Sequence, residues 1–404
     1  MTDFKERFAV LRDRLDRLDP PHLWDEIERR SPSRSTHSRS ASSRLLVAAF
    51  ALAIGVGGIA LTLQAFGSSD RSPAGTTPAP GTSGLPPIGA IPDVAIRKGV
   101  TLDLASEGSV VAATEAFGSL WVGMITDQGQ LQLARADPST GAIEHTFAVD
   151  IPAREWGGDG IVSGAGSVWV PGGTDGEGAR IARIDPATDQ VDVIDLPGRA
   201  VSSLAFDRDG RLWASISLDE SGNGEIAELD PATGDVLSTW PFHAQWSNGV
   251  YPAQGTAWIH EMGVKNSTVE GGWLTQIVPG DAPSVTIGGS FAEPVSDGTA
   301  LWTPFHGDER AVNLANGIAR IDPRTGQIVD EWKTASIGYD LAIGDDGGVW
   351  FLGGAGLERL NPSTGDTDVD QPLAGTPIFI APSPGGLWIG TTDGKLIRYD
   401  VVPS

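Results

Sequence analysis

Aromatic and titratable side chains gather in a few segments that interrupt an otherwise regular chain. Imidazole and carboxylate groups can exchange protons, and indole and guanidinium groups are enriched where proteins bind ligands. These segments are therefore the candidate ligand-binding region, although their spacing singles out no catalytic residue. The candidates are Trp156, His243, Trp246, His260, Glu261, Trp273, His306, Glu309 and Arg310.

Two of these segments are insertions, residues 260–273 and 305–313. Their histidines and acids suggest a metal site as one hypothesis, but single residues without a fixed ligand spacing are a weak indication, so metal ligands stay unassigned. The chain contains no Cys. It also has no nucleophile motif, phosphate-binding loop, zinc-binding helix or calcium loop. The hypothetical metal ligands are His260, Glu261, His306 and Glu309.

The insertions interrupt a repeat that is defined by tryptophan. A Gly-x-x-Trp phrase, with one extra residue in one copy, recurs at intervals of 38 to 48 residues. A period of about 40–45 residues built from short strands is typical of β-propeller blades. Seven copies predict seven blades, with each tryptophan in a blade core. The tryptophans are Trp121, Trp169, Trp213, Trp258, Trp302, Trp350 and Trp388.

A second phrase, Asp-Pro-x-Thr-Gly or a close variant, follows most of these tryptophans. The Asp or Asn side chain bonds its own backbone two residues on, Pro presets φ, and Gly ends the turn with a positive φ. Each copy follows an alternating run such as Ala179–Ile184, which predicts a half-buried strand. The fold class is therefore all-β, a propeller of four-stranded blades. The turns begin at Asp137, Asp185, Asp230, Asp322 and Asn361.

The last blade lacks one strand. It contains the predicted strands Pro377–Ala381, Leu387–Gly390 and Lys395–Tyr399, and the chain ends soon after. Before the first blade, Val100–Leu104 resembles fourth strands such as Val191–Leu196. We predict that it completes the seventh blade and closes the ring, since an open ring would expose unpaired strand edges.

The predicted topology places the candidates on one face. In such blades the tight turns share one face, while the loops between second and third strands and the inter-blade connections lie on the other. Both insertions are second-to-third loops, and Trp156 and Trp246 fall in inter-blade connections. We therefore predict a binding mouth for a peptide or glycan. The alternative is that Trp156, Trp246 and Trp273 pack under long loops.

A long apolar stretch precedes the repeats. Leu45–Phe66 is 22 residues without a charge, and about 20 apolar residues cross a bilayer as a helix. Arginines without acids precede it, which predicts a single span, a cytoplasmic N-terminus and an extracytoplasmic propeller in the cell membrane. A cleaved secretory signal is the competing interpretation. The predicted parts are a cytoplasmic helical segment (1–44), a transmembrane helix (45–66), a Pro/Gly/Ser/Thr-rich linker (67–99) and the propeller (100–404).

Acidic residues dominate the extracytoplasmic part. The chain has 28 basic and 52 acidic residues, a net charge of −24. From residue 45 onward the counts are 18 basic and 44 acidic, so 18 − 44 = −26. This charge argues against nucleic acid as a partner and against docking on anionic lipid.

The first residues carry a short amphipathic pattern whose apolar face is too small to bury itself and so needs a partner protein, a second copy or the membrane surface. Its apolar positions are Phe4, Phe8, Leu11, Leu15 and Leu18. The phrase Leu23-Trp24-Asp-Glu-Ile27 resembles the start of actinobacterial single-pass membrane proteins encoded beside extracytoplasmic-function sigma factors. That resemblance implies a cytoplasmic sigma factor as partner. The alternative is a plain cytoplasmic stub.

The repeats themselves resemble the virginiamycin B lyase group and, more loosely, NHL-like and gluconolactonase propellers. Gly-x-Leu-Trp and Ile-Ala-Arg-Ile-Asp-Pro-x-Thr, as at Ile181–Thr188, carry the resemblance over nearly all of residues 100–400. It implies a magnesium-assisted elimination by His and Glu on one face. The chain departs from the family's acidic-x-His pattern, because His260 and His306 precede their acids.

Three hypotheses follow from these patterns. The leading one is a membrane-anchored extracytoplasmic binding or sensing module that signals to a cytoplasmic partner and has no assigned cofactor. The alternative is a propeller enzyme of the lyase or lactonase type, with Mg²⁺ if it is lyase-like. The third is a scaffold for assembly of the cell envelope.

Overall fold

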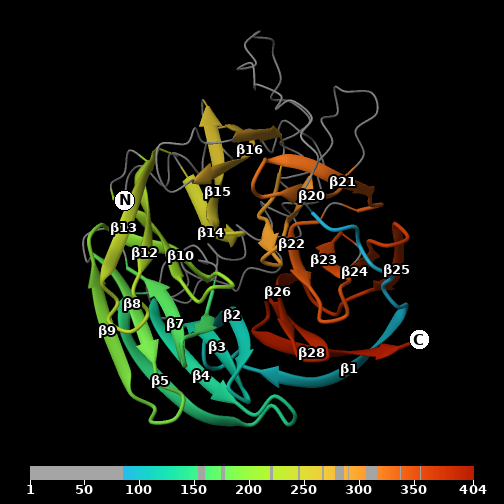
Figure 1. Cartoon of the computed structure of the whole chain (residues 1–404). Helices are drawn as coiled ribbons and strands as arrows, with labels where there is room; N and C mark the ends of the chain where they lie inside the picture. Colours follow the sequence, from blue (N-terminus) through green and yellow to red (C-terminus); the bar gives the residue numbers. More distant parts are fainter. Residues whose placement is uncertain are drawn as a thin grey trace, which may run out of the picture. The chain divides into compact units, whose positions relative to one another are not determined.

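Residues 85–404 form a ring of β-sheets. There are seven sheets of four strands each, and they follow one another around the ring (Figure 1). This all-β, seven-bladed propeller confirms the predicted fold class. The computed structural model describes this range except for residues 127, 153–159, 174–177, 219–221, 244–245, 266–267, 278–285, 290, 306–315, 337 and 355.

In the first three blades each sheet takes its strands in chain order, with the first strand on the inside of the ring (Figure 1). Blade 1 contains β2 (Ser109–Ala116), β3 (Ser119–Ile125), β4 (Gln130–Ala136) and β5 (Ile143–Pro152). Blade 2 contains β6 (Val162–Gly164), β7 (Ser167–Gly172), β8 (Ala179–Ile184) and β9 (Val191–Leu196). Blade 3 contains β10 (Ala200–Phe206), β11 (Leu212–Ser217), β12 (Asn223–Leu229) and β13 (Val236–His243).

The next three blades repeat this order. Blade 4 contains β14 (Trp246–Ala253), β15 (Thr256–Lys265), β16 (Thr268–Ile277) and β17 (Thr286–Gly289). Blade 5 contains β18 (Val295–Ser296), β19 (Leu301–Phe305), β20 (Gly317–Asp322) and β21 (Gln327–Lys333). Blade 6 contains β22 (Asp340–Ile343), β23 (Val349–Gly353), β24 (Gly356–Asn361) and β25 (Asp366–Gln371).

Blade 7 joins the two ends of the propeller. Its sheet order is β1-β28-β27-β26, and β1 pairs antiparallel with β28, with Leu102 opposite Leu396. The predicted closing strand is confirmed. It begins earlier than expected, inside the range predicted as linker, because Val94 still finds a partner in Pro403. The strands are β1 (Val94–Asp103), β26 (Pro377–Ser383), β27 (Gly386–Thr391) and β28 (Lys395–Pro403).

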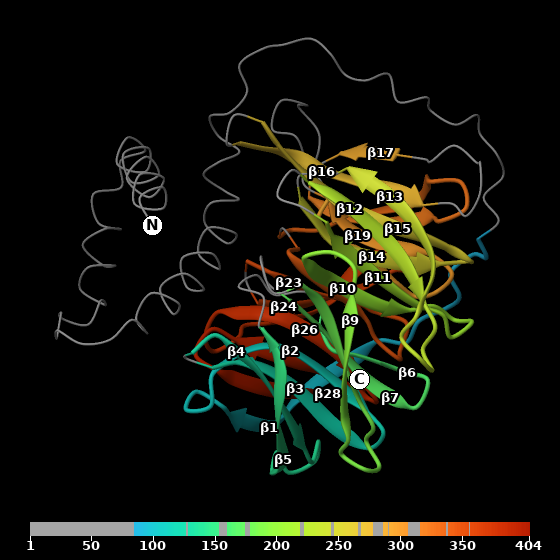
Figure 2. The same cartoon turned by 90° about the vertical axis from the view of Figure 1, so that its left-hand side faces the viewer.

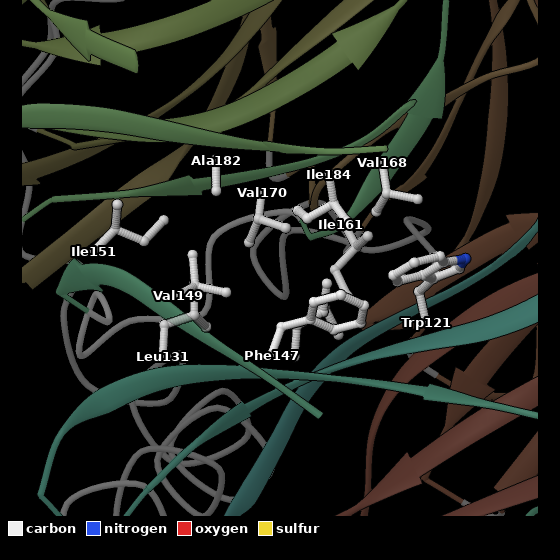
Figure 3. Packing of buried hydrophobic residues seen from close by; sticks show 12 residues of the cluster. Trp121, Leu131, Phe147, Val149, Ile151, Ile161, Val168, Val170, Ala182 and Ile184 are labelled. Atoms are coloured by element: carbon white, nitrogen blue, oxygen red, sulfur yellow. The ribbon is translucent and has the colours of Figure 1, made fainter. Parts of the chain in front are cut away.

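The repeated tryptophans lie in the blade cores, as predicted. Six of the seven are fully buried and Trp302 is 5% exposed. Figure 3 shows one such core, in which Trp121 lies beside Phe147 while Val168 and Val170 of blade 2 approach from the other side. The packing of each tryptophan against the next blade is what joins neighbouring sheets into a ring.

An arginine covers six of the seven tryptophan rings, 5.3 to 5.8 Å from the ring centroid. In five blades it is the cross-strand partner of the tryptophan, as Arg135 is of Trp121. In blade 3 the cation comes instead from Arg211, beside Trp213. Stacking of guanidinium on indole explains why the phrase Ile-Ala-Arg-Ile accompanies the tryptophan repeat.

The Asp-Pro-x-Thr-Gly segments form the predicted turns. In blade 1, the backbone nitrogen of Ser139 donates to Oδ1 of Asp137 at 2.7 Å, and Gly141 has φ of 73°. In blade 2, Asp189 occupies the same place with φ of 61°. All these turns share one side of the ring, called here the turn side.

The predicted cytoplasmic segment, transmembrane helix and most of the linker, residues 1–84, lie outside the described residues. The part of the chain that the structure describes contains no helix of the length and hydropathy needed to cross a bilayer.

Candidate functional site

The insertion of blade 4 is a β-hairpin. We predicted residues 260–273 as a loop, and this was wrong: β15 continues to Lys265, β16 starts at Thr268, and the two pair along this length. They run side by side in Figures 1 and 2. The physical reason is that extension of the hairpin pairs backbone groups that a loop would leave to water. The absence of the Asp-Pro-x-Thr-Gly phrase concealed this continuity.

Neighbouring residues of β15 face different blades. His260 lies opposite Leu274, which packs in the core shared with blade 5. Ile259 packs in the core shared with blade 3, and Glu261 shares that face because side chains alternate along a strand. This arrangement argues against a metal ion held by both His260 and Glu261. Among the described residues, no group of three or more His, Cys, Asp or Glu is arranged to hold a metal.

His260 is a core histidine. Its side chain is 2% exposed, and Nε2 lies 3.2 Å from the carbonyl oxygen of Phe291. Because a carbonyl only accepts, Nε2 carries the proton, and Nδ1 has no hydrogen-bond partner in the described part of the chain. Burial lowers the pKa of His260 to about 4, so the imidazole is neutral at pH 7. Burial removes His260 from the open face where we had expected it.

Glu261 lies in a polar cluster shared by blades 3 and 4. It accepts a hydrogen bond from Thr275 and interacts electrostatically with His243. Nδ1 of His243 lies 2.9 Å from Oδ1 of Asn223. Partial burial raises the pKa of Glu261 above its usual value, while Thr275 and His243 act in the opposite direction. The residues Asn223, His243, Glu261 and Thr275 are called the blade 3–4 cluster below.

The strand ends place this cluster on the side opposite the turns. β12 begins at Asn223 and β13 ends at His243. In an up-and-down blade these two positions lie at the end away from the turn that joins the two strands. The cross-strand pairing of Asn223 with His243 fixes their proximity, and Glu261 extends toward them from blade 4. Two adjacent blades therefore supply an amide, an imidazole, a carboxylate and a hydroxyl to one place.

The remaining candidates divide into three groups. Trp273 is half-buried and lies directly opposite Glu261 in the sheet, so it borders the blade 3–4 cluster. Trp246 begins β14, with its backbone paired to Met262, and its side chain is not among those described. The others lie outside the described residues, namely Trp156, His306, Glu309 and Arg310.

Two members of the cluster were absent from the sequence-based candidates. Asn223 and Thr275 are neither aromatic nor titratable, which were the properties that guided the selection. A signal for Thr275 existed, because it follows Trp273 by two residues and so shares its strand face. Asn223 had no such signal, since only the pairing of β12 with β13 brings it to His243.

A buried carboxylate lies between blades 5 and 6. Glu358 is 4% exposed and accepts a hydrogen bond from Oγ of Ser336. Burial and the neighbouring Asp370 raise its pKa, while the bond from Ser336 lowers it. Thr334 Oγ1 donates to the backbone oxygen of Ser336 at 2.7 Å. These contacts fasten the connection between the two blades, so we assign Glu358 a structural role.

Comparison with solved structures shows what this chain is similar to. Virginiamycin B lyase from Staphylococcus aureus superposes with a TM-score of 0.56 at 15% identity, covering 76% of this chain and 100% of the lyase. The chain shares the fold of that lyase. A catalytically inactive form of the same enzyme with quinupristin gives a TM-score of 0.55 at 15% identity, with 77% and 100% coverage.

A propeller of another class is equally similar. The WD40 domain of Neurospora crassa Pan2 has a TM-score of 0.56 at 10% identity, covering 79% of this chain and 98% of that domain. No family model and no curated protein sequence matches the chain. Identities this low establish the fold alone, and propellers host unrelated functions, so function must come from the site.

Proposed function

We propose that this protein is a membrane-anchored extracytoplasmic propeller that binds a peptide or glycan on the side opposite the turns. The blade 3–4 cluster is the observation that carries this proposal. It offers hydrogen-bond donors and acceptors at the ends of β12 and β13 and within the β15–β16 hairpin, and the half-buried Trp273 lies next to it. Peptides and glycans both combine hydrogen-bonding groups with apolar faces, and a polar cluster beside an indole suits both.

Substitution of the cluster tests the binding site. Wild-type protein and the variants Glu261→Gln and His243→Ala would be applied to arrays of peptides and glycans. Loss of one hydrogen bond to a charged group costs about 1.5–3 kcal/mol, which is a roughly 10- to 100-fold loss of affinity. Phe117→Asn, at a 50% exposed residue in a turn on the other side, is the matched control. Binding that survives both cluster variants would contradict the proposal.

The membrane anchor rests on the apolar segment 45–66 and the arginines before it. Protease added to intact cells should degrade the propeller and spare the first 44 residues. A propeller protected from the protease would reverse the proposed orientation. A propeller released from the membrane without the segment would identify that segment as a cleaved signal.

The cytoplasmic segment supports a signalling role. The spacing of Leu11 and Leu15 gives an apolar helix face that requires a partner, and the resemblance of Leu23–Ile27 suggests a sigma factor. Affinity capture with the full chain should recover such a factor, and the double substitution Leu11→Asp, Leu15→Asp should abolish its recovery. Equal recovery with the variant would contradict this part of the proposal.

A lyase is the second candidate function, favoured by the interaction of Glu261 with His243. A carboxylate of raised pKa beside an imidazole can abstract and return a proton, as an elimination requires. Incubation with quinupristin and MgCl₂ would test it, because an elimination product keeps the mass of the substrate but changes its chromatographic retention. Unchanged retention would exclude this substrate and favour the binding module.

A further inference from the structure

The residues before β1 run along the turn side of the ring. This leader, residues 85–93, packs Leu85 and Ile88 against the core between blades 5 and 6. Nδ2 of Asn361 donates to the carbonyl oxygen of Ile91 at 3.1 Å, and the backbone nitrogen of Ile91 lies 3.3 Å from Oγ of Ser363. In Figure 1 the leader is the blue segment that runs past β25 toward β20.

Elsewhere in the ring, turns make the corresponding contacts between blades. Nη1 of Arg135 in blade 1 donates to the carbonyl oxygen of Pro186 in blade 2 at 3.3 Å. Nε2 of Gln276 in blade 4 donates to the carbonyl oxygen of Pro323 in blade 5 at 2.6 Å. Both acceptors belong to Asp-Pro-x-Thr-Gly turns of the following blade. A side chain on the third strand therefore binds the turn of the next blade.

At the next two boundaries the leader supplies these acceptors. Nη2 of Arg320 in blade 5 donates to the carbonyl oxygen of Pro86 at 2.9 Å, and Nη2 of Arg359 in blade 6 donates to that of Pro92 at 3.0 Å. Blade 7 has no turn at this place, because its third and fourth strands come from the two ends of the propeller. The leader thus takes the place of the turn that blade 7 lacks and lies against the blade 6 turn that begins at Asn361.

This attachment determines the side of the ring on which the chain enters it. β1 runs from Val94, paired with Pro403 on the turn side, to Asp103, paired with Lys395 on the other side. The leader therefore enters the ring on the turn side, and His243 of the blade 3–4 cluster ends its strand on the opposite side. Eighteen residues, 67–84, separate the predicted span from the leader, and an extended chain of that length reaches about 60 Å.

We propose that the leader holds the turn side of the ring toward the membrane and presents the blade 3–4 cluster to partners that arrive from outside the cell. This inference rests on the proposed membrane anchor. A chain attached at one point of a ring could otherwise let either side approach the bilayer. The contacts of Arg320, Arg359 and Asn361 fix the leader along two blades, so the tether leaves the ring on the turn side.

Energy transfer to the membrane surface tests the orientation. Because the chain has no Cys, single substitutions give defined labelling sites in the full-length protein. Phe117→Cys lies in a turn on the turn side, and Ser106→Cys lies in the exposed connection on the opposite side. Each labelled protein would be reconstituted in vesicles that contain an acceptor-labelled lipid. Transfer should be stronger from position 117 than from position 106.

A variant with the leader detached is the matched control. Arg320→Ala combined with Asn361→Ala removes two of the contacts that hold the leader, and the difference between the two labels should then be lost or reduced. Equal or reversed transfer in the parent protein would overturn the proposed orientation while leaving the anchor intact. Failure of the chain to float with the vesicles would overturn the anchor, and the inference with it.

Discussion

At the scale of single residues, the ring depends on buried charges that its apolar repeat does not reveal. The tryptophans indicated blade cores, but their cation partners were predicted only as half-buried strand positions. Arg359 is fully buried and stands 5.7 Å from the ring of Trp350. Its guanidinium forms ion pairs with Asp346 and Asp368. The arginine thus joins the core, the blade edge and the leader in one set of contacts.

Removal of this guanidinium should destabilise the propeller strongly. Arg359→Met keeps part of the packing on Trp350 but leaves Asp346 and Asp368, with side chains 13% and 14% exposed, without their cation. Loss of one partner of a buried ion pair costs about 3–5 kcal/mol. Arg180→Met is the control, because its partner Asp195 is 80% exposed, and such surface pairs are worth about 1 kcal/mol or less. Urea denaturation that gave equal losses would contradict this assignment.

Titration of His260 should make folding less stable at acid pH. Its pKa is about 4 in the folded protein, below the 6.5 that is usual for histidine, so the unfolded chain takes up a proton first as pH falls. The stabilisation is complete above about pH 6.5 and declines between pH 6.5 and 4, by about 3 kcal/mol in total. His260→Gln removes this contribution while a side-chain amide remains to face Phe291. As pH falls, the free energy of unfolding should therefore decrease more for the wild type than for the variant. Parallel pH curves would show that His260 does not titrate in this way.

At the scale of elements, two segments that the sequence marked as irregular are built into the sheets. The insertion of blade 4 extends the β15–β16 hairpin, and residues 85–99, nearly half of the predicted linker, belong to the leader and β1. Local composition misled the linker prediction, since glycine and proline commonly mark loops, whereas the absence of the Asp-Pro-x-Thr-Gly phrase concealed the hairpin. Pairing with β28 and contacts with blades 5 and 6 determine the actual structure, and these partners lie far away in sequence.

Truncation separates the leader and the closing strand from the residues before them. A chain that starts at residue 85 should fold cooperatively, because it retains every described contact. A chain that starts at residue 104 loses β1, bares the edge of β28 and uncovers the core to which Leu102 belongs. We expect this shorter chain to aggregate or to lose its cooperative thermal transition. Equal melting of the two chains would contradict the role of β1 in closure.

At the scale of the whole molecule, the sequence repeat predicted most of the fold but little of the candidate binding site. Periodic tryptophans and turns predicted the number of blades, their strands and the closure, because each depends on local phrases repeated along the chain. The blade 3–4 cluster depends on which strand faces lie against each other. Glu261 and His243 were predicted as candidates together with His260. Only the course of β15 as a strand shows that Glu261 faces blade 3 with His243, while His260 faces blade 5. Asn223 could be recognised as a member of the cluster only from the pairing of β12 with β13.

The most direct test of the central claim is hydrogen exchange of the full-length protein with and without soluble peptidoglycan fragments, which present peptide and glycan together. We predict slower exchange at the start of β12, the end of β13 and the part of β15 and β16 around Glu261 and Thr275. Peptides that contain the turns at 137–141 and 185–189 should exchange unchanged. Glu261→Gln should remove the protection. Protection confined to the turn side, or protection that persists in this variant, would contradict a binding site at the blade 3–4 cluster.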